Sequence, residues 1–150
     1  MPRTCPMVII GFGNESFDAR LRHDLSPQSC TYLERLMPYH GQVVHASWSG
    51  EACWSPMSGV WPSGTRVASE NSTTYPGPGQ VLLYTGVLSE PELLIPYGPT
   101  CFASRSGPLA GNPVLTIVGH LGRLARIGHR IHWHGAMDLR IERVVPTLCD

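Results

Sequence analysis

Hydrophobic and polar residues alternate along much of the chain with the two-residue period of a β-strand. The period is clearest in residues 16–22, where Phe17, Ala19 and Leu21 alternate with polar and charged side chains. Shorter apolar runs bounded by Gly, Pro, Asn or Ser predict further strands. The predicted strands cover residues 7–12, 16–22, 42–48, 51–54, 80–84, 92–97, 113–118, 130–133 and 137–144.

Two segments predict helices instead. Ser26 and Pro27 form a helix start, because serine caps a helix N-terminus well and proline suits the first helical position. Apolar residues within 32–37 follow at helical spacing, and Pro38 marks the end of this helix. Residues 121–127 predict a second, short helix.

The order of these elements predicts a mainly β protein. Many short strands separated by turn signals are typical of a closed barrel or a sandwich. A length of 150 residues suits a single domain, here residues 1–150, with a substantial core. Residues 55–79 are rich in Pro, Gly and Ser and predict a long loop, which in a compact domain is usually functional or disordered.

Composition narrows the classes of partner. Charged residues make up 15% of the chain and the formal net charge is zero, so nothing favours a nucleic acid. The absence of an apolar run of membrane-spanning length and of a signal peptide predicts a cytoplasmic protein that does not enter a membrane. All 11 basic residues are arginine, which excludes a lysine Schiff base formed by the protein itself.

The five cysteines do not form a recognisable motif. Cys5, Cys30, Cys53, Cys101 and Cys149 are scattered, and no two have the CxxC spacing. A disulfide framework and a structural zinc site are therefore not expected. The apolar neighbours of Cys30 and Cys53 predict that both side chains pack in the core.

The segment SEPELLIPYG (89–98) places two carboxylates, Glu90 and Glu92, beside an apolar run. Two residues form one strand repeat, so on an extended chain both carboxylates face one way and Leu93 and Ile95 face the opposite way. The pair is either solvated or partly enclosed. In the enclosed case, burial and mutual repulsion raise the pKa of one carboxyl group and give an acid/base pair.

The tripeptide His132-Trp133-His134 suggests a different chemistry. On a strand the two histidines face one side, as two ligands of one metal ion often do. His45, His120 or Glu142 would supply a third ligand. No acidic ligand follows at a diagnostic distance, so an ordinary structural or solvent-exposed role is the alternative.

Several longer segments resemble a bacterial family of small proteins that has carried only a domain-of-unknown-function label and has a cyclophilin-like barrel. The resemblance implies a closed barrel of about eight strands with a helix at each open end. It extends from about residue 7 to residue 144 and is carried by WSGEACW (48–54), ENSTTYPGPGQVLLY (70–84), SEPELLIPYG (89–98) and FASRSGPLAGN (102–112).

Two activities are known among proteins with this type of barrel. Prolyl isomerases carry a QGGDF-type segment, which this chain lacks, so that activity is not expected. Other cyclophilin-like proteins belong to natural-product pathways and catalyse a Pictet–Spengler condensation of a tryptophan-like amine with an aldehyde, giving a tetrahydro-β-carboline. The resemblance implies this cofactor-independent reaction, with small molecules as the partners. It leaves a homodimer open.

Such a reaction needs a carboxylate to accept the indole proton, an anionic or aromatic environment for the cationic iminium, and flat apolar walls. We expect Glu90 to be the general base and Arg105 to bind a substrate carboxylate with its planar guanidinium. Each candidate also has an ordinary structural role available, in core packing, a turn or an ion pair. The candidates are Glu90, Glu92 and Glu51 as catalytic residues and Trp54, Asn71, Tyr75, Tyr97, Phe102 and Arg105 as substrate-binding residues, with no metal.

Two other functions remain open from the sequence. The first is a metal-dependent hydrolase or lyase that uses the His132 and His134 pair. The second is a barrel that binds a small ligand without catalysis. Bound metal and bound ligand distinguish these functions from the condensation.

Overall fold

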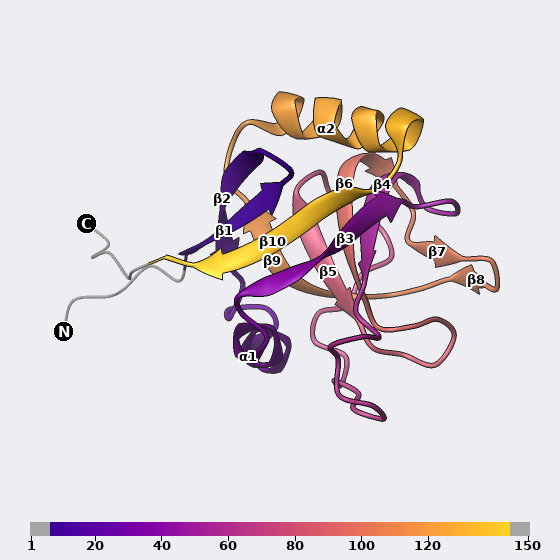
Figure 1. Ribbon diagram of the computed structural model, residues 1–150. Coiled ribbons are helices and arrows are strands. Elements are labelled where there is room, and N and C mark those ends of the chain that lie inside the picture. Colours follow the sequence, from indigo (N-terminus) through magenta and orange to yellow (C-terminus); the bar gives the residue numbers. More distant parts are fainter. Residues whose placement is uncertain (1–6, 145–150) are drawn as a thin grey trace.

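The computed structural model describes residues 7–144, in which eight antiparallel strands close into a barrel (Figure 1). The barrel strands are β1 (Met7–Phe12), β2 (Glu15–Leu21), β3 (Tyr39–His45), β4 (Gly50–Pro56), β5 (Gln80–Tyr84), β6 (Glu92–Thr100), β9 (Asn112–Ile117) and β10 (Met137–Arg143). They follow one another around the barrel as β1-β10-β3-β4-β6-β5-β9-β2. Closure leaves the barrel sheet without a free edge, and it confirms the predicted mainly β barrel of eight strands.

Alternation along the strands fills the barrel interior. In β2 the side chains of Phe17, Ala19 and Leu21 are all buried, as the two-residue period predicts. The neighbouring strand β1 is in register with both β2 and β10, so that Ile10 lies opposite Phe17 on one side and Ile141 on the other. The interior is thus formed by paired apolar positions of adjacent strands.

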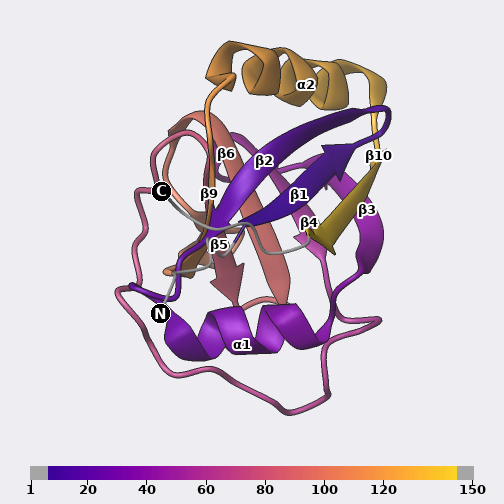
Figure 2. The same cartoon turned by 90° about the vertical axis from the view of Figure 1, so that its left-hand side faces the viewer.

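Helices cover the two ends of the barrel (Figures 1 and 2). Helix α1 (Pro27–Arg35) starts after Ser26 as predicted, but the Ser26 side chain does not cap it. Glu70 from the long loop does so instead, because its carboxylate accepts hydrogen bonds from the backbone N–H groups of Gln28 (3.0 Å) and Ser29 (2.8 Å). The loop therefore has a structural role at this end of the barrel.

The helix at the other end corrects one sequence prediction. Helix α2 spans Leu121–His134, so the strand predicted over residues 130–133 is wrong. Its buried residues Leu124, Ile127, Gly128 and Ile131 follow the spacing of one helical face, which continues beyond the predicted end of the helix. No helix among the described residues is long and apolar enough to cross a membrane.

Two further differences concern the segments that follow β3 and β6. Strand β3 ends at His45, earlier than predicted, and residues 46–49 form the turn into β4. Strands β7 (Ala103–Ser104) and β8 (Gly107–Pro108) were not predicted, because two-residue strands have no periodic signal. They form a hairpin that projects outside the barrel (Figure 1).

A second, smaller hydrophobic cluster lies on the outer face of the barrel. It makes β6 buried on both faces, with Leu93 and Ile95 in the interior and Leu94 in the outer cluster. Trp54 of β4, opposite Leu94 in the ladder, packs against this cluster. The buried members are Ala46, Ala52, Leu82, Tyr84, Leu94, Phe102 and Leu109.

Two glycines of α2 give a test of how closely this helix approaches the barrel. A Cβ atom at Gly128 would overlap the ring of Tyr97, whereas one at Gly122 would meet no atom within 4 Å. We expect Gly128→Ala to lower the free energy of unfolding by about 1–3 kcal/mol through overpacking. Gly122→Ala is the matched control and should raise it by up to about 1 kcal/mol. Denaturant unfolding measures both, and a stabilised Gly128→Ala variant would contradict the close packing.

Candidate functional site

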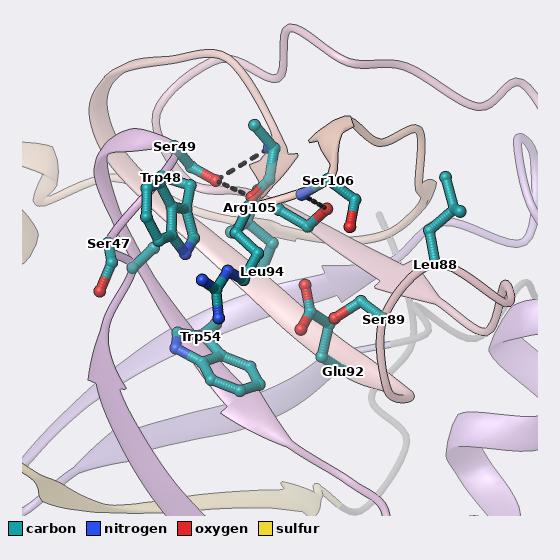
Figure 3. A pocket seen from close by; sticks show the side chains of 13 residues that line it. Ser47, Trp48, Ser49, Trp54, Leu88, Ser89, Glu92, Leu94, Arg105 and Ser106 are labelled. Atoms are coloured by element: carbon teal, nitrogen blue, oxygen red, sulfur yellow. Dashed lines mark hydrogen bonds between the residues drawn. The ribbon is translucent and has the colours of Figure 1, made fainter.

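A pocket of about 360 Å³ opens on the outer face of the barrel, beside the outer cluster (Figure 3). One wall comes from the outward-facing residues of β4 and β6, and the opposite wall comes from the β7–β8 hairpin. The volume suits a small organic ligand. Its lining includes Ser47, Trp48, Ser49, Trp54, Leu88, Ser89, Glu92, Leu94, Arg105 and Ser106.

Glu92 is the buried acid of this pocket. It is the first residue of β6 and only 5% of its surface is exposed. No hydrogen bond or ion pair to its carboxylate exists among the described residues. Every fully buried side-chain N or O atom in this part of the chain has a hydrogen-bond partner, so the Glu92 oxygens must retain their exposure toward the pocket. Burial, and secondly the negative charge of Glu90, raises the pKa of Glu92 to about 7.

Glu90 lies differently. Strand β6 begins only at Glu92, so the two carboxylates do not share one face of a strand. Glu90 is exposed and accepts a hydrogen bond of 2.7 Å from the hydroxyl of Ser58. The structure therefore places the enclosed carboxyl group at Glu92, whereas the sequence assigned the base to Glu90. The sequence also predicted that one carboxylate raises the pKa of the other, and the negative charge of Glu90 does contribute to the raised pKa of Glu92.

The positive charge of the pocket comes from Arg105. It lies at the tip of the hairpin, between β7 and β8, and its side chain reaches into the same space as Glu92 (Figure 3). Among the described residues, Arg105 forms no ion pair with any carboxylate, neither with Glu90 nor with Glu92. An unpaired guanidinium and an unpaired carboxyl group thus face one cavity.

Two indoles flank this charge pair. Trp54 is half-buried on the outer face of β4, where it forms the floor of the pocket. Trp48, in the turn after β3, is 61% exposed at the pocket rim. Sequence reasoning selected Trp54 but missed Trp48, because residues 42–48 were interpreted as a regular strand. The available signal in the sequence was a tryptophan directly before the Ser49-Gly50 turn.

Two predicted binding residues, Phe102 and Tyr97, do not line the pocket. Phe102 is 1% exposed in the outer cluster, where its ring lies 5.7 Å from that of Tyr84 in an edge-to-face contact. It supports the hairpin and does not line the cavity. Tyr97 points toward α2 rather than toward the pocket, and its hydroxyl lies 2.7 Å from Nε2 of His45.

The remaining candidates are also separate from the pocket. Glu51 is exposed and its carboxylate lies against Gly98. Asn71 has a positive φ of 49° and donates a 2.8 Å hydrogen bond to the Leu25 carbonyl, which is the turn role that the sequence allowed. Tyr75 is 74% exposed on the long loop and does not line the pocket.

The histidine pair does not have the geometry expected of a strand. His132 and His134 lie on α2, where residues two apart point in nearly opposite directions. Only His132 contacts His45, with ring centroids 4.3 Å apart. Within residues 7–144 no three His, Cys, Asp or Glu side chains converge in a way that would hold a metal ion. The prediction that both histidines lie on one face of a strand, which motivated a metal-dependent enzyme, is therefore wrong.

The buried cysteines are unsuited to nucleophilic chemistry. Burial raises the pKa of the Cys30 and Cys53 thiols to about 12, so both stay protonated at neutral pH. Their packing was predicted from their apolar neighbours and is confirmed. Cys5 and Cys149 lie outside the described residues.

Comparisons with known proteins identify the fold and the family. A family described as "Protein of unknown function (DUF3830)" matches residues 8–143. The structure of McbB in complex with tryptophan matches with a TM-score of 0.66 at 19% identity, covering 95% of this chain and 46% of the McbB chain. The solution structure of the hypothetical protein AF2241 from Archaeoglobus fulgidus matches with a TM-score of 0.51 at 12% identity, covering 95% and 98% of the two chains.

These likenesses support a cyclophilin-like barrel, as the sequence resemblance predicted. At such low identity they show the fold alone, and this chain spans less than half of the length of McbB. No curated protein matches the chain.

The raised pKa of Glu92 predicts a pH dependence of stability. Between about pH 4.5 and pH 7 the unfolded chain loses the Glu92 proton while the folded protein retains it, so the contribution of Glu92 to stability falls as the pH rises. Glu92→Gln should abolish this fall and be more stable than the parent by about 3 kcal/mol at pH 8 and above. Denaturant unfolding at pH 4.5 and pH 8 measures the difference. Glu90→Gln is the control and should keep most of the decrease in the free energy of unfolding between pH 4.5 and pH 8. The same decrease in the parent and in Glu92→Gln would contradict the raised pKa of Glu92.

Proposed function

The chain belongs to the family of proteins of unknown function (DUF3830), and we propose that its outer-face pocket catalyses a Pictet–Spengler-type condensation. The substrates are a tryptophan-like amine and an aldehyde, and the product is a tetrahydro-β-carboline. The observation that carries this proposal is the enclosed carboxyl group of Glu92, with a pKa of about 7, at a pocket flanked by two indole side chains.

The charges of the pocket match those of an aromatic amino acid. Arg105 offers a planar guanidinium for a carboxylate, and Glu92 offers a carboxylate for an ammonium group. Trp54 and Trp48 supply flat apolar surfaces for an indole ring. The bound tryptophan in McbB supports this ligand class for a barrel of the same fold.

Glu92 has two tasks in the proposed reaction. The amine and the aldehyde first condense to an iminium with loss of water, and the Glu92 carboxylate stabilises this cation. The indole ring then attacks the iminium carbon, which forms the new C–C bond. Finally the proton on indole C2 passes to the carboxylate, and the ring regains its aromaticity. A pKa near neutral pH makes Glu92 strong enough to accept that proton and weak enough to release it.

The lack of lysine favours the same chemistry. An aldehyde reacts readily with a neutral lysine amine, and such an adduct would compete with the substrate amine. All 11 basic residues of the chain are arginine, which does not form this adduct under ordinary conditions. The aldehyde therefore meets no competing side-chain amine in the pocket.

The decisive variant is Glu92→Gln, which keeps the shape of the side chain and removes the base. We expect its turnover of tryptophan or tryptamine with an aldehyde to fall by about 10²–10⁴-fold, with the fold intact. In the parent, kcat/KM should rise with pH as Glu92 of the free protein ionises, with an apparent pKa near the value of about 7. Mass spectrometry of the tetrahydro-β-carboline measures both rates.

Glu90→Gln is the matched control, because the same substitution is made two residues away on an exposed side chain. It should retain most of the turnover and shift the pH profile toward lower pH, since the Glu90 charge helps to raise the pKa of Glu92. If the parent binds tryptophan but forms no product with any aldehyde, the pocket is a non-catalytic binding site. A Glu92→Gln variant with near-parental turnover would remove the proposed base.

A further inference from the structure

We propose that Ser49 is a positioning residue that fixes the β7–β8 hairpin, so that Arg105 selects substrates bearing a carboxylate. This inference rests on the proposed function, because it assigns the origin of substrate preference at the same pocket. Nothing in the sequence pattern singles out Ser49, which is one of several serines near the pocket. Its hydrogen bonds distinguish it from them (Figure 3).

Ser49 joins the β3–β4 turn to the first strand of the hairpin. Its side chain is 4% exposed, and its hydroxyl both donates to the Ala103 carbonyl (3.1 Å) and accepts from the Ala103 N–H (3.0 Å). The Ser49 carbonyl also accepts a hydrogen bond of 3.0 Å from the N–H of Cys101. The hydroxyl therefore satisfies both backbone polar groups of Ala103, a task that no apolar side chain can perform.

The hairpin needs such an anchor because its own ladder is very short. Only two residue pairs join its strands, Ala103 with Pro108 and Ser104 with Gly107. A two-stranded ribbon of this length is not stable by itself in water. Phe102 holds the base of the hairpin in the outer cluster, and Ser49 holds the next residue, Ala103.

Arg105 lies two residues beyond that anchor, at the tip. The tip is closed by the Ser104 hydroxyl, which accepts from the N–H of Ser106 (3.1 Å) and donates to the Gly107 carbonyl (3.3 Å). Ser49 thus sets the position of the strand, and Ser104 sets the shape of the turn that carries the guanidinium. Carboxylate recognition by arginine depends on planar, directional hydrogen bonds, so a shift of the strand weakens it.

The consequence is a difference between two ligands. Tryptophan has a carboxylate for Arg105, and tryptamine has the same indole and amine without it. Loss of the Ser49 hydroxyl should therefore weaken tryptophan binding by about two- to tenfold, the range of one ordinary hydrogen bond. Tryptamine binding should change by less than about twofold, because Glu92 and the indole walls remain in place.

The experiment measures the affinity of the full chain for tryptophan and for tryptamine by titration calorimetry. Ser49→Ala removes the hydroxyl, and Ser49→Thr keeps it and should restore the preference for tryptophan. Ser29→Ala is the matched control: Ser29 is also fully buried, and its hydroxyl also donates one hydrogen bond and accepts another, at α1 rather than at the pocket. It should leave the ratio of the two affinities unchanged.

A double-mutant cycle shows whether Ser49 acts through Arg105. In an Arg105→Ala background, Ser49→Ala should cause no further loss of tryptophan affinity. Additive losses, or equal losses for both ligands, would overturn the positioning role. Parental protein that binds neither ligand overturns the proposed function as well, whereas parental binding with an unchanged preference in Ser49→Ala overturns only this inference.

Hydrogen exchange on the parent gives a second measurement that does not depend on the folding of a variant. If Ser49 anchors the hairpin, the amides of Cys101 and Ala103 should exchange as slowly as those of β6. If both amides exchange as fast as those of an unstructured peptide, the hydrogen bonds between Ser49 and the hairpin do not persist in solution, and the inference is overturned.

Discussion

The burial of β6 on both faces is the constraint on which the site depends. Leu93 and Ile95 fill the barrel, and Leu94 fills the outer cluster on the opposite face. A strand covered on both sides leaves only 5% of the surface of its first residue, Glu92, exposed. The cover on the outer face comes from the segment that carries the β7–β8 hairpin, which also brings Arg105 over the pocket. The same packing therefore encloses the carboxyl group of Glu92 and places the positive charge of Arg105 in the same pocket.

The sequence predicts the parts of this structure in which side chains repeat regularly. The two-residue period predicted β2 closely, and the apolar runs predicted β1 and β5 at their observed bounds. The strand prediction failed at residues 130–133, where a short apolar run fits either a strand or a helical face. Ile131 in this run belongs to the buried face of α2. The sequence also had no means to detect β7 and β8, because two residues show no period.

The sequence located part of the pocket lining but not its geometry. The sequence offered a carboxylate pair near a strand end, either solvated or partly enclosed, together with an arginine and aromatic residues. Three of these candidates, Glu92, Trp54 and Arg105, line one pocket. The sequence could not decide which carboxylate is enclosed, because that depends on where β6 begins: Glu90 precedes the strand and bonds to Ser58. Tyr97 was misplaced for a related reason, since inner and outer faces of a doubly buried strand look alike in sequence.

The lack of a partner for Glu92 in residues 7–144 favours a ligand-directed role over a structural one. A buried carboxyl group without a hydrogen bond or a counter-ion destabilises the folded protein whenever it is ionised, so it contributes nothing to the fold that an apolar residue would not supply better. A bound ammonium or iminium group reverses this balance, because a positive charge at the carboxyl group lowers its pKa again. Substrate binding would then itself release the proton and generate the base, at the moment when the pocket contains a proton donor. The enclosed Glu92 thus destabilises the free protein when it is ionised, and a cationic ligand would relieve this destabilisation.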